Sequence, residues 1–154
     1  MEKLNRTGMG KLTMRQLWEL EKKKNPSASE DSYLPRMVEA YRLHGRNALL
    51  GWDVGRAAYI LQACHYVGYL SQKETMELGV KAGKMAQSYF NCWDDLLESY
   101  MLGFQFWNED DIGHPDSRSY QRNLIRRRVQ DGNYCIPTPF DIVPWNAPLS
   151  ADDI

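Results

Sequence analysis

The chain has 154 residues, of which 43% are hydrophobic and 25% charged, and its formal net charge is −1. This length and composition are typical of one globular domain with a buried core, and the charge gives no general reason to expect nucleic acid or an acidic membrane surface as a partner. The three cysteines have no C-x-x-C spacing, so we expect free thiols. No apolar run reaches the roughly 18 residues of a membrane span, and the first residues do not resemble a signal peptide. We therefore expect a soluble, cytoplasmic protein.

Apolar residues recur at helical spacing along most of the chain. We expect a loose segment over residues 1–9 and a helical body over 10–131. Its helices should begin near Lys11, near Pro35, near Trp52, after a capping box at Ser71 and after an N-cap at Asn91. A last helix is expected from about residue 116 to 129. Gly45 should end the second helix.

The helix predicted over about residues 52–66 is apolar on nearly every side, which is typical of a helix surrounded by other helices. A stripe of small residues, Gly79, Gly83 and Ala86, should pack closely against it. Residues 132–154 combine four prolines with several large apolar side chains, which predicts an extended strap on the helical body. We therefore predict an all-α single domain, a compact bundle of five to six helices around a buried central helix.

One candidate site lies at the start of that central helix. Asp53 and Arg56 are three residues apart and share a helix face. Because a buried guanidinium is costly without a carboxylate partner, Arg56 should meet an acidic residue. The carboxylates available for this polar cluster are Asp53, Asp94, Asp95 and Glu98. We favour a structural ion pair; the alternative is a polar cleft that holds an anionic ligand, in a binding protein or an enzyme.

A second candidate surface combines an acidic loop with the arginine-rich helix that follows. The loop contains Glu109, Asp110 and Asp111, and Arg118, Arg122 and Arg126 are spaced four residues apart on the helix. We favour a solvated face paired with its own acidic loop over nucleic-acid binding. Segments of opposite sign also serve protein recognition, so these six residues are our candidates for binding a partner.

The residues that usually indicate catalysis are missing from the sequence. There is no P-loop, nucleophile elbow or dinucleotide fingerprint, and the three histidines follow no metal-binding spacing. We therefore predict no catalytic residue, metal or cofactor, although an enzyme stays an alternative.

Four short motifs point to a known family. They begin at Gly51 (G-W-D-V-G-R), Gly68 (G-Y-L-S), Tyr89 (Y-F-N-C-W) and Tyr100 (Y-M-L-G-F-Q-F-W). In this order they resemble the bacterial domain-of-unknown-function family 1266, over about residues 46–108. Two positions depart from its pattern: Gln105 stands where the family often has Arg, and Asn91–Cys92 replace a Ser-rich cap.

The resemblance implies a small helical bacterial protein with no assigned reaction, of a kind found near toxin or secretion genes. Together with the absence of catalytic motifs, it suggests a non-catalytic protein-binding module, of the immunity or adaptor type. The expected partner is another protein, and a homodimer stays open. The alternatives are small-ligand binding or catalysis at Asp53 and Arg56, and nucleic-acid binding through the arginine helix.

Overall fold

A computed structural model describes residues 8–28, 32–132 and 137–150. In chain order the elements are η1 (Met9–Lys11), α2 (Met14–Lys24), α3 (Tyr33–His44), η2 (Gly45–Leu49), α4 (Leu50–Tyr66), α5 (Gln72–Tyr89), α6 (Trp93–Asn108), α7 (Arg118–Gln130) and α8 (Pro139–Ile142). Across these described ranges there is no strand, so the all-α prediction is confirmed. The described residues also contain no helix long and apolar enough to cross a membrane.

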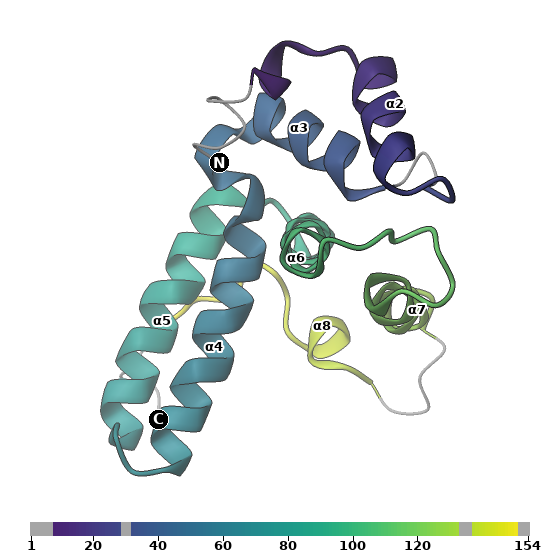
Figure 1. Ribbon diagram of the computed structural model, residues 1–154. Helices are drawn as coiled ribbons and strands as arrows, with labels where there is room; N and C mark the ends of the chain where they lie inside the picture. The colour runs from purple at the N-terminus through teal and green to yellow at the C-terminus, as the bar shows by residue number, and fades with distance from the viewer. Residues whose placement is uncertain (1–7, 29–31, 133–136, 151–154) are drawn as a thin grey trace.

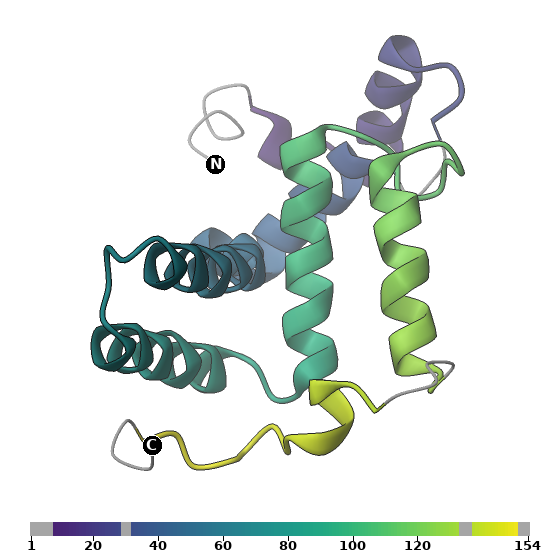
Figure 2. The ribbon, with the colours of Figure 1, turned by 90° about the horizontal axis from the view of Figure 1, so that it is seen from below.

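The helices form two antiparallel pairs that lie across one another (Figures 1 and 2). The pair α4 and α5 runs lengthwise in Figure 1, where α6 and α7 are seen end-on, and Figure 2 shows the reverse. Helices α2 and α3 cover one end of the molecule, and the C-terminal segment passes along the other side of α5 and α6. The hairpin of α4 and α5 projects from the rest as an arm.

Most helix ends follow the local signals in the sequence. Ser71 caps α5 with a full capping box, in which its side chain and that of Glu74 bond each other's backbone. Gly45 ends α3 at φ 57°, a positive backbone angle that glycine adopts readily. The predicted N-cap at Asn91 is wrong by one residue, because Cys92 occupies that position and the Asn91 backbone N–H donates to the Asp95 carboxylate.

The centre of the fold is α6, which corrects the prediction of a buried central helix over residues 52–66. Five consecutive residues of α6, from Met101 to Gln105, are buried, whereas only Gly51 is buried on α4. Met101 and Phe104 form one core cluster with Ile112. A second cluster joins α2 and α3 through Leu17, Leu34 and Val38. The apolar surface of α4 is therefore only partly covered by α5 and α6.

The strap prediction holds for residues 137–150, with one added turn of helix, α8. Trp145 donates its indole N–H to the Phe90 carbonyl at 3.1 Å. Gln87 donates to the carbonyls of Trp145 and Ala147, at 2.7 and 3.0 Å. The strap accounts for one glycine of the small-residue stripe: a Cβ at Gly83 would meet Leu149 of the strap, so this glycine accommodates the strap rather than α4, whereas a Cβ at Gly79 would meet nothing within 4 Å.

Candidate functional site

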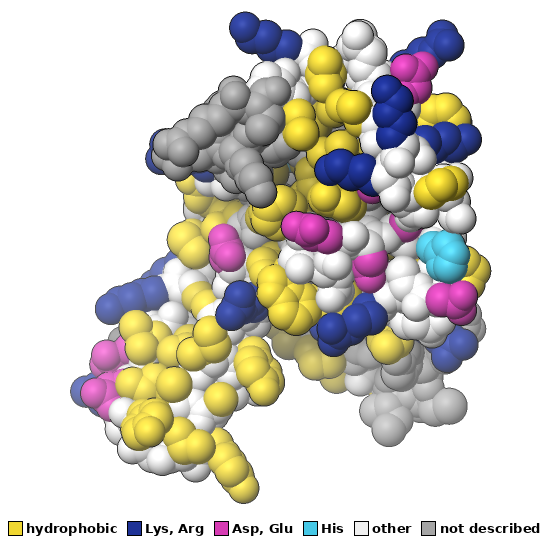
Figure 3. All heavy atoms as spheres, in the orientation of Figure 1, with side chains coloured by type: hydrophobic (Ala, Val, Ile, Leu, Met, Phe, Trp, Pro, Cys, Tyr) yellow, Lys and Arg dark blue, Asp and Glu magenta, His cyan; other side chains and the backbone are white. Residues whose placement is uncertain are grey.

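The α4–α5 hairpin carries much of the exposed apolar surface of the described chain. On α4 and the turn after it these residues are Tyr59, Ile60, Tyr66, Val67 and Tyr69, and on α5 they are Leu78, Met85 and Tyr89. We call these eight residues the hairpin surface. Tyr66 is 91% exposed and Tyr69 82%, both at the tip of the arm. Figure 3 shows hydrophobic side chains gathered over this arm.

The spacing of these residues gives the hairpin surface a regular shape. Leu78, Met85 and Tyr89 lie seven and four residues apart on α5, so they share one helix face. Tyr59 and Tyr66 are likewise seven residues apart on α4. The His65 ring bonds the Leu70 carbonyl at 3.1 Å and thereby fixes the turn at the tip. The exposed side chains therefore stand on a well-ordered scaffold.

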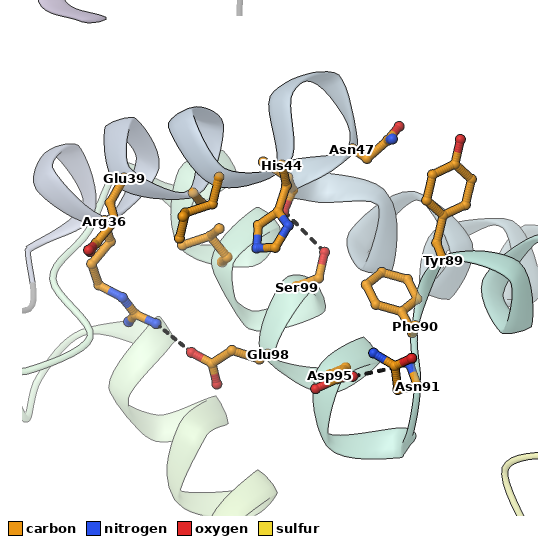
Figure 4. Close-up of a pocket in the computed structure, with 14 residues that line it drawn as sticks. Arg36, Glu39, His44, Asn47, Tyr89, Phe90, Asn91, Asp95, Glu98 and Ser99 are labelled. Atoms are coloured by element: carbon orange, nitrogen blue, oxygen red, sulfur yellow. Dashed lines mark hydrogen bonds and ion pairs between the residues drawn. The ribbon is translucent and has the colours of Figure 1, made fainter. Parts of the chain in front are cut away.

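A cleft of about 470 Å³ lies between α3, η2, the end of α5 and α6. In Figure 4 the side chains of Arg36 and Glu98 reach toward one another across it, and His44 and Ser99 both line the cleft. Serine and histidine are a common pair in nucleophilic catalysis. Here, however, the Ser99 hydroxyl donates to the Ala48 carbonyl at 3.1 Å and accepts the Gly51 backbone N–H at 3.0 Å. The hydroxyl therefore anchors the start of α4 on α6.

Glu98 pairs with two arginines, and the sequence predicted only part of this ion network. Its carboxylate accepts from Arg36 at 2.8 Å and also pairs with Arg126. Arg36 donates in addition to the fully buried amide of Gln105, at 3.1 Å, and Gln105 donates to the Asp110 carbonyl. Gln105, which departs from the family pattern, thus acts as the acceptor for a neighbouring arginine.

The structure does not bring Arg56 together with the carboxylates of the predicted polar cluster. Asp53 and Arg56 are both exposed, although Gly51 at the start of the same helix is buried. The Arg56 guanidinium lies 5.7 Å from the centre of the Trp52 ring, and within the described part of the chain no ion pair joins it to a carboxylate. Asp95 accepts the Asn91 N–H, and Asp94, also in the first turn of α6, is exposed. Whether Arg56 binds a ligand stays a prediction.

The three arginines of α7 contact α6 instead of the acidic loop. Arg118 lies over Trp107 at 5.7 Å and Arg122 over Phe104 at 4.3 Å, distances from guanidinium carbon to ring centre. Arg126 pairs with Glu98, nearer the start of α6. The expected pairing with the acidic loop is therefore wrong for these side chains, since the aromatic rings of α6 give them a nearer partner, but Arg118 and Arg122 are exposed to solvent as expected.

The acidic loop organises the connection between α6 and α7. Asp110 accepts the Ser119 backbone N–H in the first turn of α7, at 3.1 Å, and Asp111 is buried and accepts the Gly113 N–H at 2.8 Å. Glu109 ends α6 in a left-handed conformation at φ 53°. These contacts leave Glu109 as the most exposed of the three carboxylates for a partner.

A buried carboxylate on α2 was not anticipated. Burial raises the pKa of Glu21, Lys24 lowers it, and Asp111 and Glu109 raise it further. Burial likewise raises the pKa of Tyr33, with added effects of Glu109 and Glu21. In the described part of the chain, no group of three or more histidine, cysteine or acidic side chains is arranged to hold a metal ion.

The sequence model of one family, described as "Protein of unknown function (DUF1266)", matches residues 3–145. The chain belongs to the DUF1266 family. The match is longer than the resemblance over about residues 46–108, and it includes α2, α3, α7 and part of the strap. No curated protein and no solved structure matches the chain.

Within this DUF1266 chain, sequence reasoning named Glu98, Arg126 and Gln105 but did not connect them, and it missed Arg36 and the hairpin surface. Arg36 is 62 residues from Glu98 in the sequence, and no local pattern joins the two. The hairpin surface did have a signal, the apolar residues on all sides of α4. That signal was interpreted as burial within the chain.

Proposed function

We propose that this DUF1266 protein is a non-catalytic module that binds another protein through the hairpin surface. The observation that carries the proposal is the contrast between the sequence and the structure of α4. A helix that is apolar on nearly every side needs cover, yet α5 and α6 leave Tyr59, Ile60 and Tyr66 exposed. A partner protein would supply the missing cover, since large exposed apolar patches mark interaction sites.

The residue types of the hairpin surface agree with this role. Four of its eight residues are tyrosines, a type that is enriched in protein interfaces because it combines a large apolar ring with a polar hydroxyl. The arm that presents them is held at three places: by the α5 capping box, by the close crossing of α4 and α6, and by the strap on α5. A preformed surface loses little conformational entropy on binding.

The test compares hairpin variants in affinity purification. We expect the tagged protein, purified from the cells that encode it, to retain one stoichiometric partner. The triple variant Tyr59→Ser, Tyr66→Ser, Tyr69→Ser should lose this partner while unfolding at the same denaturant concentration, because all three side chains are largely exposed. As a matched control, Ile125→Ser removes an exposed apolar side chain from α7.

Two outcomes would contradict the proposal. One is retention of the partner by the triple variant, or its loss from both variants. The other is a purified wild-type protein that sediments as a dimer in which the hairpin is buried, because the cover would then come from a second copy of the chain.

The finer form of the proposal is an immunity-type or adaptor protein in the cytoplasm of a bacterium, in a toxin or secretion context. It rests on the family resemblance and on the absence of catalytic motifs in the sequence. Identification of the captured partner tests it directly, since an immunity protein should block the activity of the toxin that it binds. The geometry favours nucleic-acid binding less, because Arg118, Arg122 and Arg126 contact α6.

A further inference from the structure

A second cavity lies behind the ion network, between α3, α6, α7 and the loop before α7. Its volume is about 400 Å³, within the range of small-ligand sites. The charged side chains that line it are Arg36, Arg126, Arg127 and Glu98. Among the described lining residues, three guanidinium groups therefore face one carboxylate, and the pocket carries a local charge of about +2.

Glu98 accepts hydrogen bonds from only some of the N–H groups that the arginines of this pocket carry. It receives an N–H from Arg36 and one from Arg126, and each guanidinium carries five N–H donors. The Nε of Arg126 is buried and has no acceptor among the described residues. Because a buried N–H without an acceptor is unfavourable, an anionic ligand able to accept from this atom would remove that cost.

The arginines are also held in position before any ligand arrives. Figure 4 shows Arg36 directed at Glu98, and the buried Gln105 amide fixes its other nitrogen at 3.1 Å. The Arg36 and Arg126 side chains are only 20% and 18% exposed. Guanidinium groups fixed in this way suit the geometry of an oxyanion, which they bind through paired hydrogen bonds.

We propose that this pocket, defined by Arg36, Asn123, Arg126 and Arg127, binds a phosphate-type oxyanion. A phosphate carries about two negative charges at neutral pH, which matches the local charge of the pocket. Ile112 and Leu124 also line the cavity and give it an apolar wall for the organic part of a phosphomonoester. The proposal is separate from protein binding at the hairpin, and the triple tyrosine variant should bind the anion as the wild type does.

The experiment is titration calorimetry with inorganic phosphate and with phenyl phosphate, at neutral pH and low chloride. We expect Arg127→Gln to weaken binding about tenfold, since it removes an exposed arginine that lines the pocket. The matched control is Arg128→Gln, which removes the same charge from the next, exposed position outside the pocket. It should change the affinity less than about twofold, because exposed charges are screened.

A second variant should increase the affinity for phosphate instead of lowering it. Glu98→Gln removes the one carboxylate that competes for the guanidiniums, so phosphate should bind more tightly than to the wild type. In parallel, the nuclear magnetic resonance of the Arg126 Nε–H should shift on phosphate addition. Tighter binding of phenyl phosphate would assign an organic phosphate as the ligand, and equal binding would assign free phosphate.

The proposal is overturned if the wild-type protein binds neither phosphate at millimolar concentration. It is also overturned if Arg127→Gln and Arg128→Gln weaken binding equally, because the attraction would then be a general effect of net charge. Weaker binding by a folded Glu98→Gln protein would contradict it as well.

Discussion

Two glycines determine how closely α4 crosses α6. A Cβ added to Gly103 would lie 2.2 Å from the Cβ of Trp52, and one added to Gly51 would lie 2.4 Å from the Leu96 carbonyl oxygen. Both belong to the motifs that suggested the family. In this structure they let the backbones of α4 and α6 approach closely. This contact fixes the base of the hairpin on α6.

The Gly51→Ala substitution tests this role. The added methyl group would overlap with the backbone of Leu96 and Tyr100, which cannot move as a side chain would, so the free energy of unfolding should fall by about 3 kcal/mol. The control is Gly79→Ala, where a Cβ meets nothing within 4 Å, and it should raise stability by about 1 kcal/mol. Urea denaturation measures both; equal effects of the two substitutions would contradict the close crossing.

The buried carboxyl of Glu21 predicts a pH dependence of stability. Burial raises its pKa above the ordinary 4.5, so the folded chain keeps this proton to a higher pH than the unfolded chain does. Since the folded state then binds more protons, this group makes the free energy of unfolding fall as the pH rises above 4.5. Below that pH both states are protonated, and the effect disappears.

Glu21→Gln removes this titration. The stability of the variant relative to the wild type should rise as the pH is increased from 4.5 to neutrality, and the two proteins should converge at the acid end. Chemical denaturation at a series of pH values gives the comparison. Glu19→Gln, on the exposed side of the same helix, removes the same charge; a parallel rise in this control would show a general charge effect instead.

At the scale of elements, the strap is joined to α5 and α6 by a small number of side chains. The indole N–H of Trp93 donates to the Val143 carbonyl at 2.8 Å, and its ring meets those of Phe140 and Trp145 edge-on. Gln87 binds two strap carbonyls. These contacts cover an apolar groove of about 520 Å³ between the hairpin and α6.

Replacement of Gln87 should release the strap without unfolding the helices. Gln87→Leu removes two hydrogen bonds of about 1 kcal/mol each, so the amides of the non-proline residues from 143 to 149 should exchange hydrogen faster while those of α6 keep their protection. Gln62→Leu, at an exposed position of α4, is the control. Unchanged exchange in the strap would show that the tryptophan contacts hold it alone.

At the scale of the whole molecule, the sequence predicted features that depend on neighbouring residues and missed features that depend on how distant helices pack. The capping box at Ser71 and the stop at Gly45 depend on residues within one turn, and both were predicted correctly. The burial of residues 52–66 was predicted wrongly, because periodicity shows that a helix needs cover but not which surface supplies it. The pairing of Arg36 with Glu98 could not be predicted, since packing of distant helices creates it.

The same division applies to the candidate sites. The arginines of α7 were recognised by their spacing, but their contacts with Trp107 and Phe104 depend on how α6 and α7 align. The hairpin surface was visible in the sequence only as an excess of apolar residues. Its exposure is a property of the assembled chain, and it is the reason for proposing a protein partner.

The most direct measurement of the central claim is photo-crosslinking from inside the interface. A benzophenone side chain placed at Tyr66, which is 91% exposed at the tip of the arm, should crosslink to a different protein in the cells that encode the chain. The same group at Ile125, exposed on α7, should not. A crosslinked partner at position 66 alone is the result that we predict. Crosslinking from both positions equally, or from neither, would contradict protein binding through the hairpin surface.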